Sequence, residues 1–247
     1  MPNHCRSADY GSRSISQAHQ DWADFVGYDR SSSEGADREE ALVFARAMMQ
    51  RARGYVLDVI EELQRAGYRF VDPDATYVPP NSETEDWLNS LPGRNIHLPI
   101  ALQAWLLEVG NVNLMGTHPS WPTPAYAFED RRADGYPIYT DPLVVELLPD
   151  FLDYLHDEWL EEQSGDVFIG DLAPDHLHKA NISGGMPYGL PTDRPRVDTI
   201  LLFERHCTSF TGYLRRALYW QGFPGFDYME AEEIAATGWR FDPAALI

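Results

Sequence analysis

Hydrophobic positions recur every three or four residues between residues 38 and 66, which is the spacing of one face of an α-helix. Asp37 precedes this run as a candidate N-cap, and Gly67 follows it as a candidate C′ residue. The apolar seam consists of Leu42, Ala45, Met49, Ala52, Val56, Val59 and Leu63. We therefore predict a helix over 38–66 that packs on its own domain, with a homodimer formed through the 42–63 seam as the alternative.

A second helical pattern covers residues 98–109, where Pro99 suits the first turn and Gly110 ends the helix. Its apolar face consists of Leu102, Trp105, Leu106 and Val109. The stretch 67–97 between the two helices contains four prolines and is predicted to be a connector. Residues 1–37 are rich in Ser, Asp, Gly and Arg and are predicted to form a loosely ordered arm.

Short runs of β-branched or aromatic residues, bounded by Gly, Pro or Asp, predict strands in the middle of the chain. These runs are 111–115, 125–128, 142–148, 166–170 and 197–203. Thr208 or Ser209 is the expected N-cap of a later helix that extends to about Trp220, and a short acidic helix is predicted over 229–236.

Strands grouped in the middle, with helices before and after them, predict an α+β fold. We expect a central, mostly antiparallel sheet flanked by helices, with an N-terminal helical extension. The expected division is an arm (1–37), a helical extension with its connector (38–97) and one α+β domain (98–247).

A helix with two distinct faces is predicted over 148–163. The apolar face consists of Leu148, Phe151, Leu152, Leu155 and Trp159. The candidate partner-binding residues form the acidic side and are Asp150, Asp153, Asp157, Glu158, Glu161 and Glu162. The same carboxylates are also typical of a solvated helix face, and that interpretation stays open.

Charge indicates the kind of partner to expect. The chain has 19 Lys and Arg against 39 Asp and Glu, a formal net charge of -20, and no Lys or Arg lies between Arg132 and Lys179. A surface this acidic repels nucleic acid and anionic lipid and attracts basic proteins. We therefore expect a basic protein partner, no nucleic-acid partner and no membrane.

Cysteine content and hydrophobicity bear on location. The two cysteines, Cys5 and Cys207, are too few for a disulfide framework and are expected to be free thiols in a reducing cytoplasm. No apolar run is long enough for a membrane helix, and the N-terminus shows no apolar leader. A cytoplasmic location is the resulting expectation.

The stretch 173–189, APDHLHKANISGGMPYG, concentrates polar chemistry in one loop. Its candidate ligand-binding residues are Asp175, His176, His178, Lys179, Ser183, Gly184 and Gly185. The lysine precedes the glycines, the reverse of a P-loop, and the two histidines lack a third ligand at a recognisable spacing. No G-x-S-x-G elbow is present either. We predict no catalytic residue, no metal and no cofactor, and interpret the stretch as a turn capped by Asp175, with one glycine at positive φ.

The segment LPIALQAWLLEVGNVNLMG resembles the entry motif of the SMI1/KNR4-like (SUKH) superfamily, in which a helix starting with Leu-Pro delivers an aromatic residue and a glycine before the first strand. These positions are Leu98, Pro99, Trp105 and Gly110. PLVVELL, FIGDLAPDHLHKANISGG and FTGYLRRALYWQGFPG resemble that family's next strand, its acidic turn with a Gly-containing loop, and a C-terminal helix. The long N-terminal helix and the histidine-rich loop depart from the family pattern and indicate a divergent bacterial subgroup.

The resemblance implies a non-enzymatic protein-binding domain with an α+β fold over 98–247. Bacterial members of the family are widely immunity proteins that bind and neutralise toxin domains, and toxin nucleases tend to be basic. An immunity protein against a basic toxin is therefore the expected function. The alternatives are an enzyme or ligand-binding domain that uses the 173–189 loop, and a regulatory scaffold that self-associates through the 42–63 helix.

Overall fold

The computed structural model describes residues 36–118, 140–162, 167–182, 185–229, 231–236 and 238. Its α-helices are α2 (Ala36–Arg65), α3 (Thr84–Ser90), α4 (Ile100–Glu108), α5 (Pro149–Glu162), α6 (Phe210–Tyr219) and α7 (Ala231–Ala236). Its 3-10 helices are η1 (Leu91–Arg94), η2 (His178–Ala180) and η3 (Pro224–Tyr228). Its strands are β1 (Arg69–Phe70), β2 (Tyr77–Val78), β3 (Asn111–Asn113), β4 (Gly116–Thr117), β5 (Val144–Val145), β6 (Ile169–Ala173) and β7 (Tyr188–Pro191).

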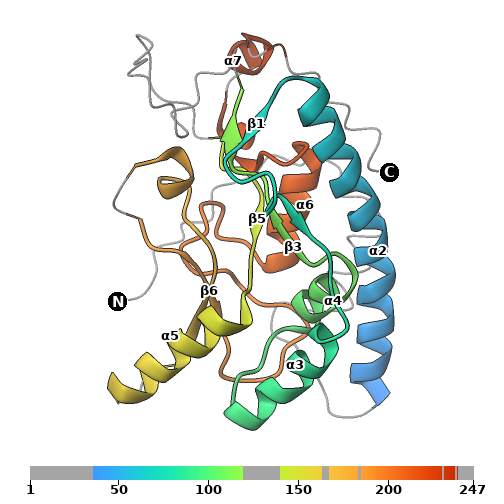
Figure 1. Ribbon diagram of the computed structural model, residues 1–247, viewed down its shortest axis with the longest axis vertical. Helices are drawn as coiled ribbons and strands as arrows, with labels where there is room; N and C mark the ends of the chain where they lie inside the picture. The colour runs from blue at the N-terminus through green and yellow to red at the C-terminus, as the bar shows by residue number, and fades with distance from the viewer. Residues whose placement is uncertain are drawn as a thin grey trace.

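The fold is α+β, as predicted from the order of the patterns. Among the described residues the strands form three small antiparallel sheets, β1–β4, β2–β3–β5 and β6–β7, where one central sheet was expected. Figure 1 shows α2 along one side of the molecule, the strands through its middle, and α5 projecting at the lower left. None of the described helices is long and apolar enough to cross a membrane.

The seam of α2 packs inside the chain. Ala45, Met49, Val56 and Leu63 are buried, and α2 lies against α4 and α6 in one core that includes residues from both sides of position 97. The predicted helix and its Gly67 stop, at φ +86°, are confirmed, but the helix already includes Ala36, so Asp37 lies inside it and is not its N-cap. Because five of the seven seam residues are buried in the chain's own core and Leu42 and Ala52 are partly buried against it, most of the seam is not available to a second copy.

Helix α4 lies at the centre of this core. Trp105 has no exposed surface, and its ring meets that of Phe210 on α6 edge to face with centroids 6.3 Å apart. Glu108 at the end of α4 accepts hydrogen bonds from Arg46 and Gln50 of α2. The predicted helix over 98–109 is confirmed, with Pro99 at the N-cap and Gly110 at φ +93° immediately after it.

The predicted strands are confirmed only in part. β3 lies within the expected 111–115, and β6 overlaps the expected 166–170 only at 169–170 and continues to Ala173. β5 is shorter than the expected 142–148, and the run 125–128 lies outside the described residues. The expected strand 197–203 is wrong, since only isolated bridges form at Ile200 and Leu202. Side-chain hydrogen bonds replace a ladder there, because Asp198 accepts from the amides of Thr199 and Thr211. The connector 67–97 contains α3, which the prolines concealed.

The later helices follow their predicted caps. α6 begins after Ser209, whose hydroxyl accepts from the amide of Gly212, and α7 lies within the predicted 229–236.

The predicted apolar face of the 148–163 helix is rotated in the structure. Leu152 is buried, but Leu148 and Phe151 are 50% and 47% exposed, so their assignment to the inner face is wrong. The inner face instead includes His156, whose ring stacks on Trp159 and meets Phe168 edge to face. Periodicity gives the spacing of a stripe, but contacts with other elements decide which part of it is covered.

The expectation of two free thiols is also wrong. Cys207 is disulfide-bonded, and the only other cysteine of the chain, Cys5, lies outside the described residues.

Two glycines test the backbone argument in opposite directions. A Cβ at Gly110 would collide with the carbonyl oxygen of Val78, and its φ is positive, so Gly110→Ala should lower the free energy of unfolding by more than about 1 kcal/mol. A Cβ at Gly54, within α2, meets nothing within 4 Å, so Gly54→Ala should raise it by about 0.5–1 kcal/mol. Urea unfolding of both variants checks the pair, and equal effects would contradict the described turn.

Candidate functional site

The 173–189 loop is a turn built around Asp175. This carboxylate is buried, accepts from the amide of Leu177 at 2.8 Å and pairs with the ring of His178. Its hydrogen bonds to His178 and to the backbone amides outweigh the effect of burial and hold the pKa of Asp175 below its ordinary value. A Cβ at Gly185 would collide with the same carboxylate, so the glycine is needed for close approach.

The turn prediction is therefore confirmed at Asp175, with one difference. Asn181 has a left-handed φ of +57°, whereas Gly185 does not have a positive φ, so the expected glycine at positive φ is not found among the described glycines of the loop. Ser183 and Gly184 lie outside the described residues.

Lys179 leaves the loop and enters the core. It is the only lysine in the sequence, and its side chain is completely buried. Its Nζ lies 2.7 Å from Oδ1 of Asp141 and 3.2 Å from the hydroxyl of Tyr213, while the hydroxyl of Tyr188 donates to Oδ2 of Asp141 at 2.9 Å. The ammonium also lies 4.5 Å from the centroid of the Tyr188 ring, which supplies a cation–π contact. The lysine expected to face a ligand is thus bonded within the protein.

Ionisation in this buried centre is fixed by its own charges. Burial lowers the pKa of the Lys179 ammonium, but Asp141 and Tyr213 outweigh that effect, so the net shift is upward and the lysine stays charged. Burial raises the pKa of Tyr213 to about 12 and, together with the Asp141 carboxylate, raises the pKa of Tyr188 well above its ordinary value. The centre is therefore an ion pair flanked by neutral hydroxyls.

A second buried turn lies beside it. Glu204 accepts from the backbone amides of His206 and Thr208 and pairs through its other oxygen with Nδ1 of His206 at 2.8 Å. The His206 ring packs on Tyr228 with centroids 4.8 Å apart. Its Nε2 is buried without a hydrogen-bond partner among the described residues and lies 3.9 Å from a carboxylate oxygen of Asp227.

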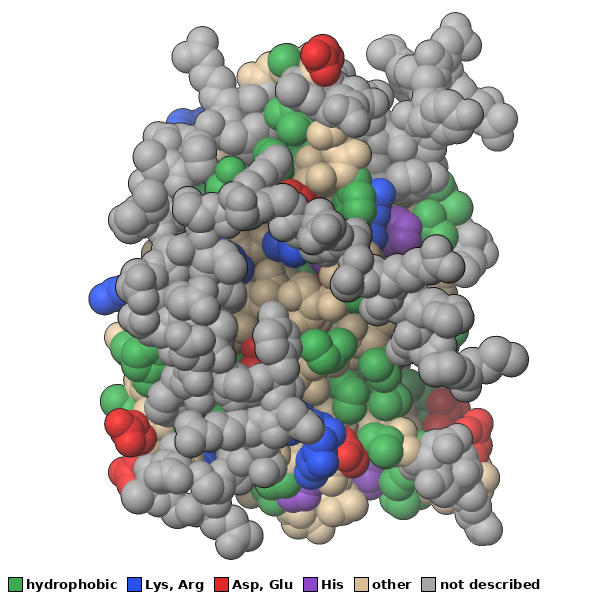
Figure 2. Space-filling model, turned by 180° about the vertical axis from the view of Figure 1, so that it is seen from behind, with side chains coloured by type: hydrophobic (Ala, Val, Ile, Leu, Met, Phe, Trp, Pro, Cys, Tyr) green, Lys and Arg blue, Asp and Glu red, His purple; other side chains and the backbone are tan. Residues whose placement is uncertain are grey.

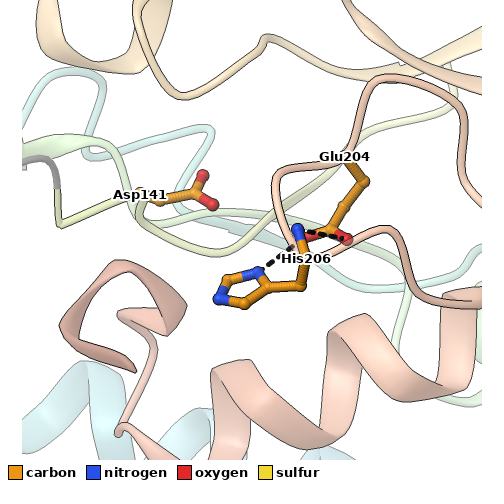
Figure 3. Close-up of side chains that lie close together, drawn as sticks. All are labelled: Asp141, Glu204 and His206. Carbon is orange, nitrogen blue, oxygen red and sulfur yellow. Dashed lines mark hydrogen bonds and ion pairs between the residues drawn. The ribbon is translucent and has the colours of Figure 1, made fainter. Parts of the chain in front are cut away.

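Asp141, Glu204 and His206 form the one three-residue cluster in the described part of the chain that could hold a metal ion (Figure 3). One ligand atom from each lies within 4.8 Å of the others, and all three residues are buried. Both oxygens of Asp141 are bonded to Lys179 and Tyr188, and Glu204 is bonded to its own turn. A metal here would have to displace the ammonium of Lys179, so the cluster fits an internal cation better than an added one.

The six acidic residues predicted to bind a partner fall into two groups on α5. Asp153 and Asp157 lie on the side that faces Arg94, which forms an ion pair with each of them. Asp150, Glu161 and Glu162 are exposed and have no ion-pair partner among the described residues, and Glu158 accepts from the hydroxyl of Tyr154. The surface available to a partner is therefore narrower than the sequence indicated.

A pocket of about 250 Å³ opens elsewhere, between η1, the start of α4 and the chain around Arg196. No residue of the 173–189 loop lines it. The described candidate ligand-binding residues therefore do not share this opening, and among them only His178 is exposed, with about half of its side-chain surface accessible.

No family model, no curated protein and no solved structure matches the chain.

The partners of Lys179 lack a local signal in the sequence. Asp141 and Tyr213 lie 38 and 34 positions away, and only the fold brings them together. The one available hint is that a single lysine occurs among 19 basic residues and sits between turn-forming segments.

Removal of Lys179 tests the ion pair. Lys179→Met leaves Asp141 buried without a counter-charge and should lower the free energy of unfolding by roughly 3–5 kcal/mol. Asp141→Asn in the same chain should restore part of the loss, because asparagine tolerates the backbone φ of +48° and carries no charge. Urea unfolding of the single and double variants measures this, and strictly additive losses would contradict the pairing.

Alkaline pH tests the buried hydroxyls. Tyr188, Tyr213 and Lys179 keep their protons in the folded state where the unfolded chain releases them, because each has a raised pKa. Their contribution is therefore complete below the ordinary tyrosine pKa of 10.0 and is lost as pH rises above it, by up to about 1.4 kcal/mol per pH unit for each group. Unfolding measured from about pH 9 to 11 should show this fall, and a flat profile would contradict the buried centre.

Proposed function

We propose that the chain is a non-enzymatic binding protein whose acidic α5 face contacts a basic protein. The observation that supports this most directly is the exposed set Asp150, Glu158, Glu161 and Glu162 on a helix that contains no Lys or Arg. Such a face raises the rate of encounter with a positively charged surface and repels polyanions. Within this proposal the partner is a nuclease-like toxin domain and the chain its immunity protein, as the SMI1/KNR4-like resemblance implies.

The expected cytoplasmic location and the disulfide-bonded state of Cys207 point to different compartments for the proposed binding. A toxin nuclease would be neutralised in the cytoplasm, where the sequence-based expectation places the chain. Disulfides persist mainly in oxidising compartments, and Cys207 is disulfide-bonded. Cys207 does not belong to α5, so the acidic face is proposed to bind in either redox state.

Use of the 173–189 loop as a catalytic or ligand site has less support. Lys179 is fully buried against Asp141, and Asp175 is buried against its own turn. Both groups would have to break internal bonds before they could contact a ligand, at the cost of leaving a buried charge unpaired.

Partner capture with charge variants tests the proposal. The purified chain should retain a basic protein from a lysate of its own source at low ionic strength and release it at moderate salt. The triple variant Asp150→Asn, Glu161→Gln, Glu162→Gln should weaken binding of the purified partner by about tenfold, mainly through slower association. Titration calorimetry and stopped-flow kinetics measure the two effects.

A charge-matched control separates the α5 face from overall acidity. Asp58→Asn, Glu62→Gln and Glu85→Gln change three exposed carboxylates on α2 and α3 and alter the net charge equally. This control should bind like the unaltered chain. Equal loss in both triples would show that only net charge matters, and no loss in either would overturn the proposal.

A further inference from the structure

Two aromatic rings stand on the outer face of α5. Phe151 is 47% exposed and Tyr154 is 54% exposed, and their rings stack with centroids 6.4 Å apart and planes inclined by 22°. At about 100° per residue, Tyr154 lies about 160° around the helix from both Leu152 and His156, which are buried, and Phe151 lies about 100° and 140° from them. Single exposed apolar residues are common, but a stacked pair on one projecting helix forms a contiguous apolar surface.

Contacts on the inner face and one flank of α5 fix the helix that carries the Phe151 and Tyr154 rings. Leu152 is buried, the His156 ring stacks on Trp159, and Arg94 of η1 pairs with Asp153 and Asp157 on one flank. The outer face is therefore presented by a fixed helix. Aromatic side chains have few rotatable bonds, so little conformational entropy is lost when they are covered.

The polar atom of the pair is already satisfied. The hydroxyl of Tyr154 donates to the carboxylate of Glu158, and this hydrogen bond raises the pKa of Tyr154. A partner that covers the tyrosine ring therefore does not leave an unbonded hydroxyl. Burial of both rings would add apolar contact at the middle of a surface whose edges are charged, the usual anatomy of a protein interface.

The charge around the two rings determines which kind of partner this surface attracts. Asp150, Glu158, Glu161 and Glu162 flank the two rings, so two copies of this face would repel each other, and anionic lipid would be repelled as well. A basic protein surface is attracted to the same carboxylates.

Figure 2 shows the face opposite to that of Figure 1, where acidic side chains lie mostly at the margins and hydrophobic ones reach the surface in separate groups.

We infer that the basic partner carries an apolar pocket rimmed by Lys or Arg, and that the Phe151 and Tyr154 rings insert into this pocket. The inference rests on the proposed function and gives that surface an apolar centre. The carboxylates then steer the approach and fix the orientation, while the rings slow dissociation.

Two synthetic peptides of equal length and equal lysine number test the inference with the full chain. One alternates Lys and Leu with helical spacing, and the other replaces every Leu by Ser. Fluorescence anisotropy should show the Lys/Leu peptide binding at least about tenfold more tightly than the Lys/Ser peptide. Phe151→Ala and Tyr154→Ala should each reduce this ratio, and the double variant should bring it close to one.

Matched variants separate the rings from the charges. Phe44→Ala, at a ring 43% exposed on α2, should leave the ratio unchanged. The α5 charge triple should weaken both peptides. Circular dichroism and the thermal midpoint establish that each variant is folded, as expected for exposed positions.

Each outcome decides between the two proposals. Equal affinity of the two peptides, or a ratio that survives loss of both rings, overturns the aromatic inference and leaves the acidic face intact. If neither the charge triple nor the loss of both rings changes peptide binding, the aromatic inference and the proposed acidic binding face are both wrong. A ratio that Phe44→Ala reduces equally assigns the effect to general surface hydrophobicity and also overturns the inference.

Discussion

The structure depends on one buried ion pair, between Lys179 and Asp141. Two opposite charges without exposed surface are stable only when each neutralises the other and the remaining hydrogen-bonding atoms are satisfied. The Lys179 ammonium therefore also donates a hydrogen bond to the hydroxyl of Tyr213 in α6. The hydroxyl of Tyr188 in β7 donates a hydrogen bond to the second carboxylate oxygen of Asp141. Tyr213 in turn exchanges hydrogen bonds with the backbone of Val144 in β5. The pair thus connects the segment around Asp141 and β5 to η2, β7 and α6, through hydrogen bonds between residues 34 to 47 positions apart.

Local rules predicted the parts of the fold that are decided locally. The spacing of apolar residues located α2, α4 and α6, and Ser209 and Gly110 marked ends of helices correctly, because capping and positive φ involve only neighbouring residues. The Lys179 centre could not be predicted, since its hydrogen-bonded pairs lie 34 to 47 positions apart and no pattern specifies their pairing. The chain over 197–203 was misassigned for a related reason, because the carboxylate of Asp198 takes hydrogen bonds that propensity assigned to a ladder.

For α5, the spacing of residues predicted the helix correctly but did not predict which of its side chains are exposed. Spacing placed α5 and its carboxylates, and the structure then divides them between Arg94 and solvent. The helix phase moves Phe151 from the core to the outside, beside charges that the sequence had assigned to a separate face. A face that looked purely electrostatic in sequence is amphipathic in three dimensions.

The burial of the only lysine has a practical consequence for handling the protein. The other 18 members of the Lys and Arg set are arginines, so the folded chain presents no side-chain amine to solvent. Amine-directed acylating reagents, amine-directed crosslinkers and lysine-modifying enzymes therefore find no side-chain amine until the fold opens. A single acyl adduct on Lys179 would record that opening, which makes the residue a built-in chemical reporter of unfolding.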